Sequence, residues 1–392
     1  MKNERQNLNQ AFKDVLSALT GRPKLLLHVC CAPCLAACLD RLYSKFDITL
    51  YYYNPNIHPD REHYLRLLEI KRLIETYPGI KIVETEPDFS EYVGCVKELL
   101  GSAEHGEKCD RCISLRIRKT AVFGAEHGFD YFCTTLSASP LKDAERINEL
   151  MKEYASIYNV KYLPSDFKKE NGQLISKEKC NQLGIYRQNY CGCTPVGSYA
   201  VAITGGIASG KSLFCSYLKE LGADVISADE VAAKIQSKGD FLKKQQLLFP
   251  ECFENGALNR NKLREIVLNS PGRRKELEGL LHPEIIRSIL IWLQSKKGPA
   301  FVEVPLLFET GLERYFDYVI NIQSSSLIRK DRFKERGGSD EDFDKFVASQ
   351  KSDEQRSRLS DITIENNSGE AVLKEKARSI YECIVLKAET KQ

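Results

Sequence analysis

The sequence lacks any long run of apolar residues. No stretch of about 18 uninterrupted apolar residues occurs, so we expect no membrane-spanning helix. Its first residues, MKNERQNLNQ, are polar and charged and have no apolar core, so we expect no secretory signal peptide. Together these two absences favour a cytoplasmic location.

The chain also lacks an excess of charge of one sign. Its 57 Lys and Arg residues nearly balance 54 Asp and Glu residues, for a net charge of +3. Nucleic-acid binding would therefore need a local basic patch, because no bulk field is present. There is no internal repeat or low-complexity tract. The 392 residues, 42% hydrophobic and 28% charged, predict a globular chain of two or three domains.

Cysteine is scarce in the second half of the chain and abundant in the first. Eleven of the 14 cysteines precede Tyr199. Without a secretory signal, grouped cysteines favour metal or redox chemistry over a disulfide scaffold. The asymmetry indicates two halves with different functions.

Strands alternate with helices in both halves. In the first half we expect strands at residues 24–29, 48–53, 80–83 and 131–135, and helices at 63–75, 113–123 and 144–158. The pattern restarts with strands at 199–204, 224–226, 300–304 and 318–322. Such alternation predicts an α/β fold in which each of two domains is a mostly parallel sheet flanked by helices. The seam Pro195–Ser198 divides the chain into domains 1–197 and 198–392.

The second half opens with a phosphate-binding motif. It fits G-x-x-x-x-G-K-[ST], follows a predicted strand and opens a predicted helix, and its residues are Gly205, Gly206, Ile207, Ala208, Ser209, Gly210, Lys211 and Ser212. Glycines let backbone N–H groups surround phosphate oxygens, Lys211 would neutralise the β- and γ-phosphates of ATP, and Ser212 would bind Mg²⁺. The competing interpretation, a glycine-rich turn that binds nothing, is disfavoured by the flanking strand and helix.

Three cysteine groups stand out in the first half. Cys30, Cys31 and Cys34 follow the first strand, Cys109 and Cys112 open a predicted helix, and Cys191 and Cys193 are separated by one glycine. Two cysteines from the first turn and two from C-x-x-C can form a four-thiolate site for zinc or an iron–sulfur cluster. Spacing alone leaves both open. The expected position at the carboxyl edge of the sheet, where substrates bind, favours the cluster.

The Cys191-Gly192-Cys193 group has a different character. A disulfide between thiols so close in the chain would be strained, and strained, accessible disulfides are easily reduced and usually catalytic. The alternative is two free cysteines in a turn.

Further blocks in the second half carry a resemblance to dephospho-CoA kinase. They are ITGGIASGKS, GADVISADEVA, NGALNRNKL, LLHPEI, VPLLFETGL, RFKER and SDITIENN. The resemblance implies a P-loop kinase fold with a helical lid and transfer of the ATP γ-phosphoryl group to the 3′-hydroxyl of dephospho-CoA. It implies that Asp229 orients or deprotonates that hydroxyl, that His282 lies near the acceptor, and that Arg332 and Arg336 close over the phosphates.

This half departs from the kinase pattern in places. Ser227 stands where the family usually has a first aspartate, before the retained Asp229. An arginine of the family is replaced within Ala232-Ala233-Lys234, and the P-loop ends Lys-Ser-Leu. These departures leave open a degenerate kinase module.

The first half, residues 25–193, resembles the QueH-type epoxyqueuosine reductase family. The matching blocks are LLLHVCCAPC, YYYNPNIHP, GEKCDRC, TTLSASPLK, DFKKENG and YRQNYCGC. The resemblance implies a Rossmann-like domain of the nucleotide-hydrolase or PP-loop type and reduction of epoxyqueuosine to queuosine in tRNA. It further implies a 4Fe-4S cluster held by Cys30, Cys31, Cys109 and Cys112, and a redox-active disulfide between Cys191 and Cys193.

Our interpretation is a bifunctional enzyme. Its partners would be tRNA containing epoxyqueuosine, dephospho-CoA and an unidentified electron donor, with ATP and Mg²⁺ at the kinase. Beside the cluster cysteines, Asp110 is a candidate for binding a further iron or giving a proton. Tyr186 and Tyr190 are candidates for base stacking. The alternative is a zinc-containing tRNA-binding protein fused to a P-loop kinase or to its degenerate form.

Overall fold

The chain forms two compact units, Met1–Pro195 and Val196–Gln392. The computed structural model describes residues 7–102, 105–193, 197–254 and 256–390, so Pro195 and Val196 of the expected seam lie outside the described residues. Among the helices that are described, none is both long and apolar enough to cross a membrane.

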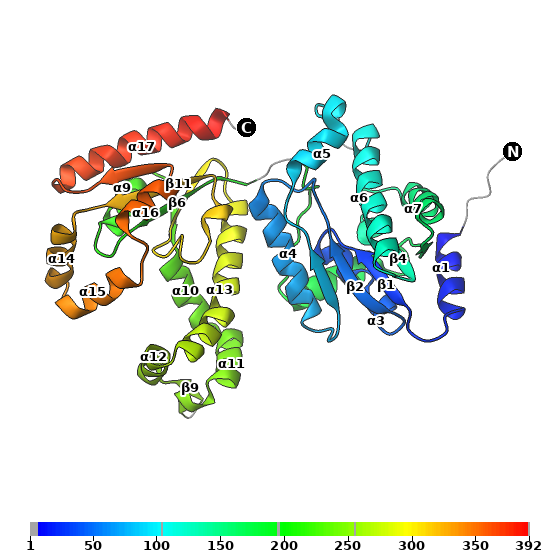
Figure 1. The fold of residues 1–392 in the computed structure, drawn as a ribbon, viewed down its shortest axis with the longest axis horizontal. Coiled ribbons are helices and arrows are strands. Elements are labelled where there is room, and N and C mark those ends of the chain that lie inside the picture. The colour runs from blue at the N-terminus through cyan, green and yellow to red at the C-terminus, as the bar shows by residue number, and fades with distance from the viewer. Residues whose placement is uncertain (1–6, 103–104, 194–196, 255, 391–392) are drawn as a thin grey trace. The chain divides into compact units, whose positions relative to one another are not determined.

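The first unit is built on a five-stranded parallel sheet (Figure 1). Its strand order is β3-β2-β1-β4-β5, from β1 (Lys24–His28), β2 (Asp47–Tyr52), β3 (Lys81–Glu84), β4 (Tyr131–Thr134) and β5 (Lys161–Tyr162). The order reverses between β1 and β4. In an open parallel sheet this switch point is where the carboxyl ends of strands leave a crevice for ligands.

Helices cover both faces of this sheet because alternate strand residues point to opposite sides. Leu26 faces α6 (Glu107–Glu126) and α7 (Ala144–Tyr158). Leu25 and Leu27 face the other layer, which contains α1 (Leu8–Ser17), α2 (Ala32–Ala36), α3 (Leu39–Tyr43), α4 (Asp60–Ile74) and α8 (Gly172–Gln182). The remaining helices are α5 (Phe89–Val96) and the short 3₁₀ turns at 97–99 and 135–138.

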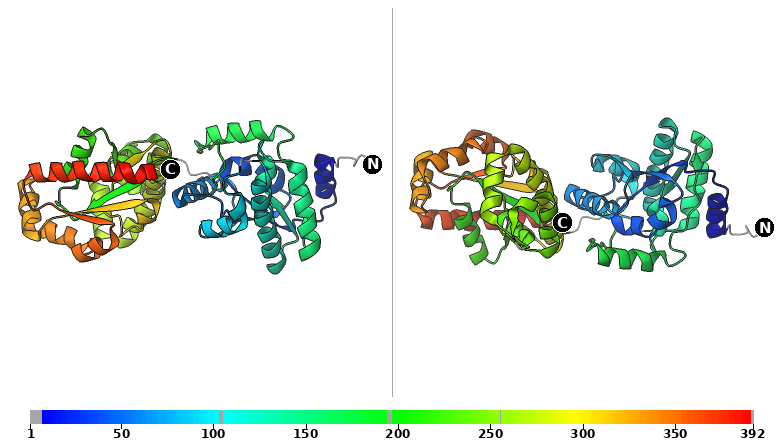
Figure 2. Two further views of the ribbon diagram at one scale, coloured as in Figure 1. Left: turned by 90° about the horizontal axis from the view of Figure 1, so that it is seen from above. Right: turned by 90° about the horizontal axis from the view of Figure 1, so that it is seen from below.

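The second unit is also a five-stranded parallel sheet with helices and its own core, but its strand order differs (Figures 1 and 2). Its parallel sheet has the order β12-β11-β6-β10-β7, from β6 (Tyr199–Gly205), β7 (Asp224–Ser227), β10 (Pro299–Glu303), β11 (Tyr318–Gln323) and β12 (Ile362–Glu365). The helix α9 (Lys211–Glu220) and the long α17 (Glu370–Thr390) pack on one face through residues such as Phe214 and Ala377.

Two groups of helices extend from this second sheet. One contains α10 (Ala228–Gln236), α11 (Gly239–Leu248), α12 (Arg260–Asn269) and α13 (Pro271–Gln294), with a small hairpin of β8 (Phe253–Glu254) and β9 (Ala257–Leu258). The other contains α14 (Ser326–Glu335), α15 (Asp340–Ala348) and α16 (Asp353–Leu359). Short 3₁₀ turns lie at 250–252 and 313–315.

The expected α/β architecture is confirmed. Each sheet has one strand that the sequence patterns do not predict, β5 and β12, and several element ends differ. The helix expected at 113–123 begins six residues earlier, at Glu107. Its first turn carries Glu107 and Asp110, whose negative charges stabilise the N-terminus of a helix. The C-x-x-C pair therefore lies within the first two turns of α6.

Candidate functional sites

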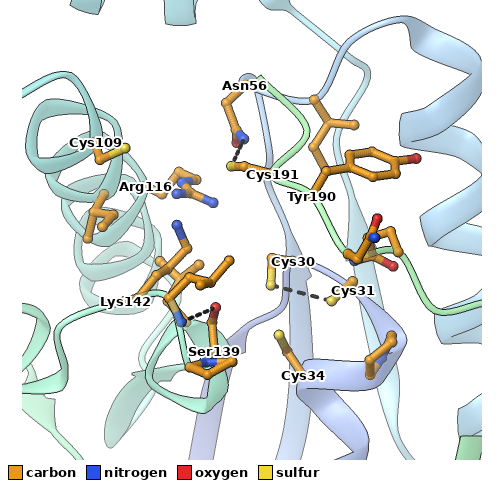
Figure 3. A pocket seen from close by; sticks show the side chains of 18 of the residues that line it. Cys30, Cys31, Cys34, Asn56, Cys109, Arg116, Ser139, Lys142, Tyr190 and Cys191 are labelled. Atoms are coloured by element: carbon orange, nitrogen blue, oxygen red, sulfur yellow. Dashed lines mark hydrogen bonds between the residues drawn. The ribbon is translucent and has the colours of Figure 1, made fainter. Parts of the chain in front are cut away.

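A pocket of about 870 Å³ opens at the switch point of the first sheet (Figure 3). The turn after β1 supplies Cys30, Cys31 and Cys34 to one wall. The start of α6 supplies Cys109, and the first turn of α8 supplies Gln173. The loop that follows α8 supplies Tyr190 and Cys191. Five of the cysteines singled out in the sequence analysis thus face one cavity.

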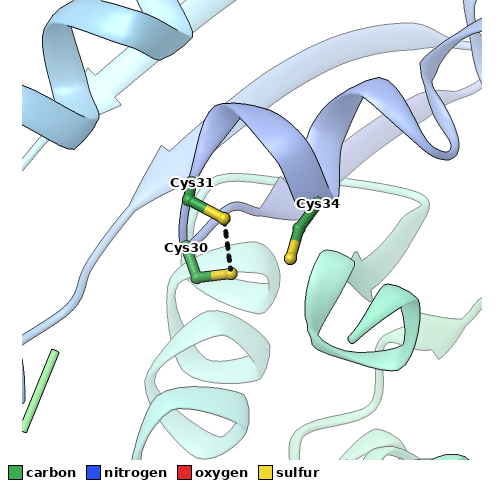
Figure 4. A group of neighbouring side chains, drawn as sticks. All are labelled: Cys30, Cys31 and Cys34. Atoms are coloured by element: carbon green, nitrogen blue, oxygen red, sulfur yellow. Dashed lines mark hydrogen bonds between the residues drawn. The ribbon is translucent and has the colours of Figure 1, made fainter. Parts of the chain in front are cut away.

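The three cysteines of the β1 turn form the tightest sulfur group (Figure 4). Their Sγ atoms all lie within 4.8 Å of one another, and those of Cys30 and Cys31 are 3.8 Å apart. The Cys30 backbone N–H donates to Thr135 Oγ1 at 3.4 Å, which ties this turn to the segment after β4. Cys34, which the predicted ligand set omits, is therefore part of the group.

The structure separates the two cysteines of the C-x-x-C motif. Cys109 lines the pocket, and its Sγ accepts a hydrogen bond from the His105 backbone N–H at 3.2 Å. Cys112 is buried against Tyr92 and Val96 and does not line the pocket. The four predicted cluster ligands are thus divided between the β1 turn, the pocket wall and this packed layer.

Arg116 provides the main buried positive charge of the site. It is only 2% exposed, and its Nε donates to the Cys112 carbonyl oxygen at 3.2 Å. No carboxylate among the described residues forms an ion pair with it, whereas Cys112, Cys191 and Cys30 raise its pKa when they carry charge. A buried guanidinium surrounded by sulfur requires a negative group nearby, either thiolates or an anionic ligand.

Within each cysteine group, hydrogen bonding between neighbouring thiols lowers the pKa of one cysteine and raises the pKa of another. Hydrogen bonds from Cys31 and Cys34 hold the pKa of Cys30 well below its usual value, while hydrogen bonding to Cys30 raises the pKa of Cys31 to about 12. In the same way, the Cys193 thiol lowers the pKa of Cys191, and Cys191 raises that of Cys193. Each group therefore favours one thiolate, which is the nucleophilic and metal-binding form.

The loop that carries Cys191 and Cys193 is packed closely on the segment after β2. A Cβ atom at Gly192 would lie 2.8 Å from Ile57 Cγ1, so only glycine fits there without movement. The Gly192 carbonyl oxygen accepts from the His58 backbone N–H at 2.8 Å, and Asn56 Nδ2 lies 3.9 Å from Cys191 Sγ. These contacts hold the Cys191 sulfur toward the pocket.

The two aromatic candidates also lie at this site. The hydroxyls of Tyr186 and Tyr190 are 3.0 Å apart, and Tyr190 lines the pocket beneath the Arg66 guanidinium, which is 5.4 Å from its ring centre. The basic residue Arg187 also lines the pocket, and its Nη1 donates to Ser176 Oγ at 2.7 Å.

In the second unit the phosphate-binding loop joins β6 to α9. Gly205 and Gly210 have φ values of +149° and +99°, which non-glycine residues rarely adopt. Lys211 is nearly buried, and its Nζ donates to the carbonyl oxygens of Gly205 and Gly206 at 2.9 and 3.0 Å. Ser212 Oγ donates to Glu303 Oε1, at the end of β10, at 2.8 Å.

This loop lines a second pocket, of about 380 Å³, together with Asp229 and Arg336. Arg332 instead hydrogen-bonds Ser324 Oγ at 3.1 Å and the Asn366 carbonyl oxygen at 3.3 Å. His282 lies within the long helix α13 and does not line this pocket. Of the residues expected around the phosphates, the structure thus brings Asp229 and Arg336 to the P-loop pocket.

Ser227 has a structural role in the place where the kinase pattern has an aspartate. It is the N-cap of α10, and its Oγ accepts from the Asp229 backbone N–H at 3.2 Å. Serine and aspartate are both good N-caps, so Ser227 caps the start of α10 as an aspartate at this position would.

Sequence analysis missed a pair of arginines above the P-loop. Arg329 and Arg356 are 4% and 3% exposed and share the Asp353 carboxylate; Arg329 Nη2 lies 2.9 Å from Asp353 Oδ2. A Cβ atom at Gly206 would overlap Arg329, so both guanidinium groups lie directly on the loop. The sequence signal that could have identified Arg329 as a residue near the P-loop is its position one turn before Arg332 on the same helix.

Known families match the two units separately. A model of "Epoxyqueuosine reductase QueH" matches residues 25–196, and one of "Dephospho-CoA kinase" matches 199–371. An epoxyqueuosine reductase QueH of Staphylococcus epidermidis is 40% identical over 204 residues, which are 49% of this chain and 85% of that protein. A dephospho-CoA kinase of Fusobacterium nucleatum is 33% identical over 188 residues, 47% of this chain and 97% of that protein. The chain joins a QueH family domain to a dephospho-CoA kinase family domain.

Both halves therefore belong to enzyme families. Other relatives agree for the QueH half, among them the Streptococcus pyogenes protein, which is 41% identical over 189 residues, 47% of this chain and 72% of that protein. Among solved structures, a dephospho-CoA kinase from Campylobacter jejuni is 28% identical, with a TM-score of 0.40, and covers 48% of this chain and 98% of that chain.

Proposed function

We propose that the chain is a bifunctional enzyme that reduces epoxyqueuosine to queuosine in tRNA and phosphorylates the 3′-hydroxyl of dephospho-CoA. Family membership of each half supports the two activities. The single observation that carries the reductase proposal is the convergence of five cysteines on one pocket at the switch point of the sheet.

The pocket suits an anionic iron–sulfur group. The proposed ligands are Cys30, Cys31 and Cys109, which line the pocket, and Cys112, which is buried and does not line it. Thiolates are the ligands that such clusters use. Arg116 brings a buried positive charge that no carboxylate balances among the described residues, and it would offset the charge of a thiolate-bound cluster. When bound, a 4Fe-4S cluster supplies electrons one at a time.

Residues of the chain itself have proposed roles in electron storage, base binding and proton transfer. Cys191 and Cys193 form the proposed redox-active pair that stores two electrons as a dithiol and releases them on forming a disulfide. Tyr190 offers an aromatic face to the modified base. Asp110, the candidate for a further iron or a proton, pairs with Arg146 at 3.0 Å.

One observation favours a second candidate for the first half. Ligands on a single tetrahedral zinc, with Zn–S bonds near 2.3 Å, lie about 3.8 Å apart. The sulfurs of Cys30 and Cys31 have this spacing, and Cys34 lies close by. A zinc-containing tRNA-binding domain would use these three cysteines and would carry out no epoxide reduction.

Metal analysis of the anaerobically purified chain separates the two candidates. We expect about four iron and four acid-labile sulfide per chain with a broad brown absorbance, as for one 4Fe-4S cluster. Reduction of tRNA containing epoxyqueuosine, with dithionite as reductant, follows as the activity assay. Stoichiometric zinc without sulfide would contradict the reductase proposal and leave the kinase proposal intact.

The kinase half has the groups that phosphoryl transfer needs. The P-loop and Lys211 would hold the ATP phosphates, and Ser212 would bind Mg²⁺ beside Glu303. Asp229 lies in the same pocket, where we propose that it orients or deprotonates the acceptor hydroxyl. Arg332, Arg336 and His282 remain proposed lid and acceptor residues.

Asp229→Asn tests the kinase proposal. We expect loss of dephospho-CoA phosphorylation by a factor of about 10² or more, because the amide cannot accept the hydroxyl proton. The neighbouring Glu230→Gln is the matched control, since Glu230 is also exposed on the first turn of α10 but does not line the pocket. Unchanged turnover in Asp229→Asn would contradict the assignment.

A further inference from the structure

Lys142 is held at the rim of the cysteine pocket by its backbone. Its N–H donates to the Ser139 carbonyl oxygen at 3.2 Å, and its own carbonyl oxygen accepts from Lys168 Nζ at 2.8 Å. The residue lies just before α7 in the TTLSASPLK block, to which sequence analysis gave no catalytic role. Figure 3 shows it on the wall that carries Arg116 and Cys109, across the pocket from Cys30.

The side chain of Lys142 is half-buried, and its ammonium group has no acidic partner among the described residues. Within the part of the chain that the structure describes, no carboxylate lies within ion-pair distance of its Nζ. Its positive charge instead acts on sulfur. Together with hydrogen bonding to Cys193, it lowers the pKa of Cys191, and it opposes the burial that raises the pKa of Cys112. A half-buried ammonium directed at a substrate pocket is a proton donor available for catalysis.

The other acidic groups of the pocket are already engaged. The carboxylate of Asp110 pairs with Arg146, and that of Asp143 accepts the backbone N–H groups of Glu145 and Arg146 as the cap of α7. Burial raises the pKa of Tyr190, whose hydroxyl also contacts Tyr186, so it is a weak acid.

Two further groups compete less well for this role. The pKa of Cys34 is raised by hydrogen bonding to Cys30, so its thiol holds its proton. His105 lines the pocket but is exposed to solvent. Because an imidazole can also donate a proton, His105 is the alternative proton donor that the experiment tests directly.

We propose that Lys142 is the proton donor to the epoxide oxygen. The inference rests on the proposed reductase function. The two C–O bonds break, a C=C bond forms between the two ring carbons, and the oxygen leaves as water. The Cys191–Cys193 dithiol is oxidised to a disulfide, supplies the two electrons and releases its two protons to solvent. The two protons reach the oxygen through Lys142, which is reprotonated from solvent between them.

A proton donor is needed because breaking the first C–O bond would otherwise leave an alkoxide, a strong base and a poor leaving group. Lys142 can protonate the oxygen as this bond breaks and can protonate the resulting hydroxyl so that it departs as water. Arg116 cannot do this, because a guanidinium does not release its proton in proteins.

The test is single-turnover reduction of tRNA containing epoxyqueuosine, with dithionite as reductant. Lys142→Met and Lys142→Arg should each lower the rate by about 10²–10⁴-fold, since neither side chain donates a proton. Lys152→Met, an exposed lysine of α7, should stay within about threefold of the wild-type rate. His105→Gln tests the competing donor, and a loss of rate in it as large as that in Lys142→Met would overturn the inference. Metal content and tRNA affinity should match those of the wild type in all four variants.

Chemical rescue distinguishes proton donation from a structural role. Methylammonium should restore part of the activity of Lys142→Ala, while tetramethylammonium, which carries charge but no acidic proton, should not. A wild-type rate in Lys142→Arg, or a loss of tRNA affinity as large as the loss of rate, would overturn the inference while wild-type reduction upholds the proposed function. A wild-type protein that fails to reduce the epoxide would overturn both.

Discussion

The side chain of Gln350 occupies a hydrogen-bonding position of the P-loop. Its Oε1 accepts a hydrogen bond from the Ile207 backbone N–H at 3.0 Å. Backbone N–H groups of this loop are the donors that bind phosphate oxygens in P-loop proteins. Gln350 thus sits where an oxygen of a bound nucleotide would be expected, and it follows directly on α15 and Ser349.

Removal of this amide should make nucleotide binding easier. Gln350→Ala frees the Ile207 N–H, and because a neutral hydrogen bond contributes about 1 kcal/mol, we expect the KM for ATP to fall about fivefold. Gln350→Glu should raise it, since a carboxylate repels phosphate. Gln246→Ala, an exposed glutamine of α11, is the control. Steady-state kinetics with dephospho-CoA measure the effect, and an unchanged KM in both variants would show that Gln350 does not compete with ATP.

Asp353 should matter for both stability and activity of the kinase half. Asp353→Asn removes the carboxylate shared by Arg329 and Arg356 and leaves two buried guanidinium groups uncompensated. We expect the free energy of unfolding to fall by about 2–3 kcal/mol, with ATP partly restoring it because phosphates supply negative charge. Urea unfolding with and without ATP provides the measurement. Asp344→Asn, exposed on α15, should behave as wild type.

Cysteine variants can decide the ligand set of the proposed cluster. Cys112→Ala should abolish bound iron and sulfide, whereas Cys34→Ala should retain them, because Cys112 is a proposed ligand and Cys34 is not. Cys95→Ala, a half-buried cysteine outside the pocket, should keep full metal content. Iron retained in Cys112→Ala but lost in Cys34→Ala would assign the metal to the compact group of the β1 turn.

The first unit should lose stability in mild acid through His63. This side chain is fully buried, and burial lowers its pKa from 6.5 to about 4. Between these values the unfolded chain binds a proton that the folded chain does not, so stability falls as the pH drops from about 6.5 to 4. His28 acts in the same direction, because burial lowers its pKa to about 4 as well.

His63→Phe removes one of these titrations and keeps the shape of the side chain. Each group contributes at most about 1.4 kcal/mol per pH unit, so the variant should lose stability less steeply than the wild type across this range. Urea unfolding at pH 4.5, 5.5 and 6.5 gives the slope. His127→Gln, exposed at the end of α6, should leave it unchanged, and an equal slope in His63→Phe would show that His63 does not titrate on unfolding.

Much of the fold was predictable because local patterns and topology agree. The strand 24–29 is an apolar run, and the parallel order follows from strands separated by helices. Apolar periodicity predicts too late a start for α6, because the first turn of the helix is polar and the periodicity begins only at Ile113.

Less of the site was predictable, because it depends on packing between segments far apart in the sequence. The P-loop motif is local, so spacing alone predicts its eight residues. The grouping of Cys34 with Cys30 and the burial of Cys112 against Tyr92 depend on how α2 and α6 pack on the sheet. No spacing rule gives the position of Arg356 above Gly206, 150 residues away.

The close packing of Gly192 on Ile57 limits how this sequence can vary. Even alanine at position 192 places a methyl group too near Ile57, so a single substitution there displaces the Cys191 loop. A smaller residue at position 57 removes the overlap. Substitutions at these two positions should therefore be accepted together and not singly, and a library randomised at both should show this pairwise dependence among its active members.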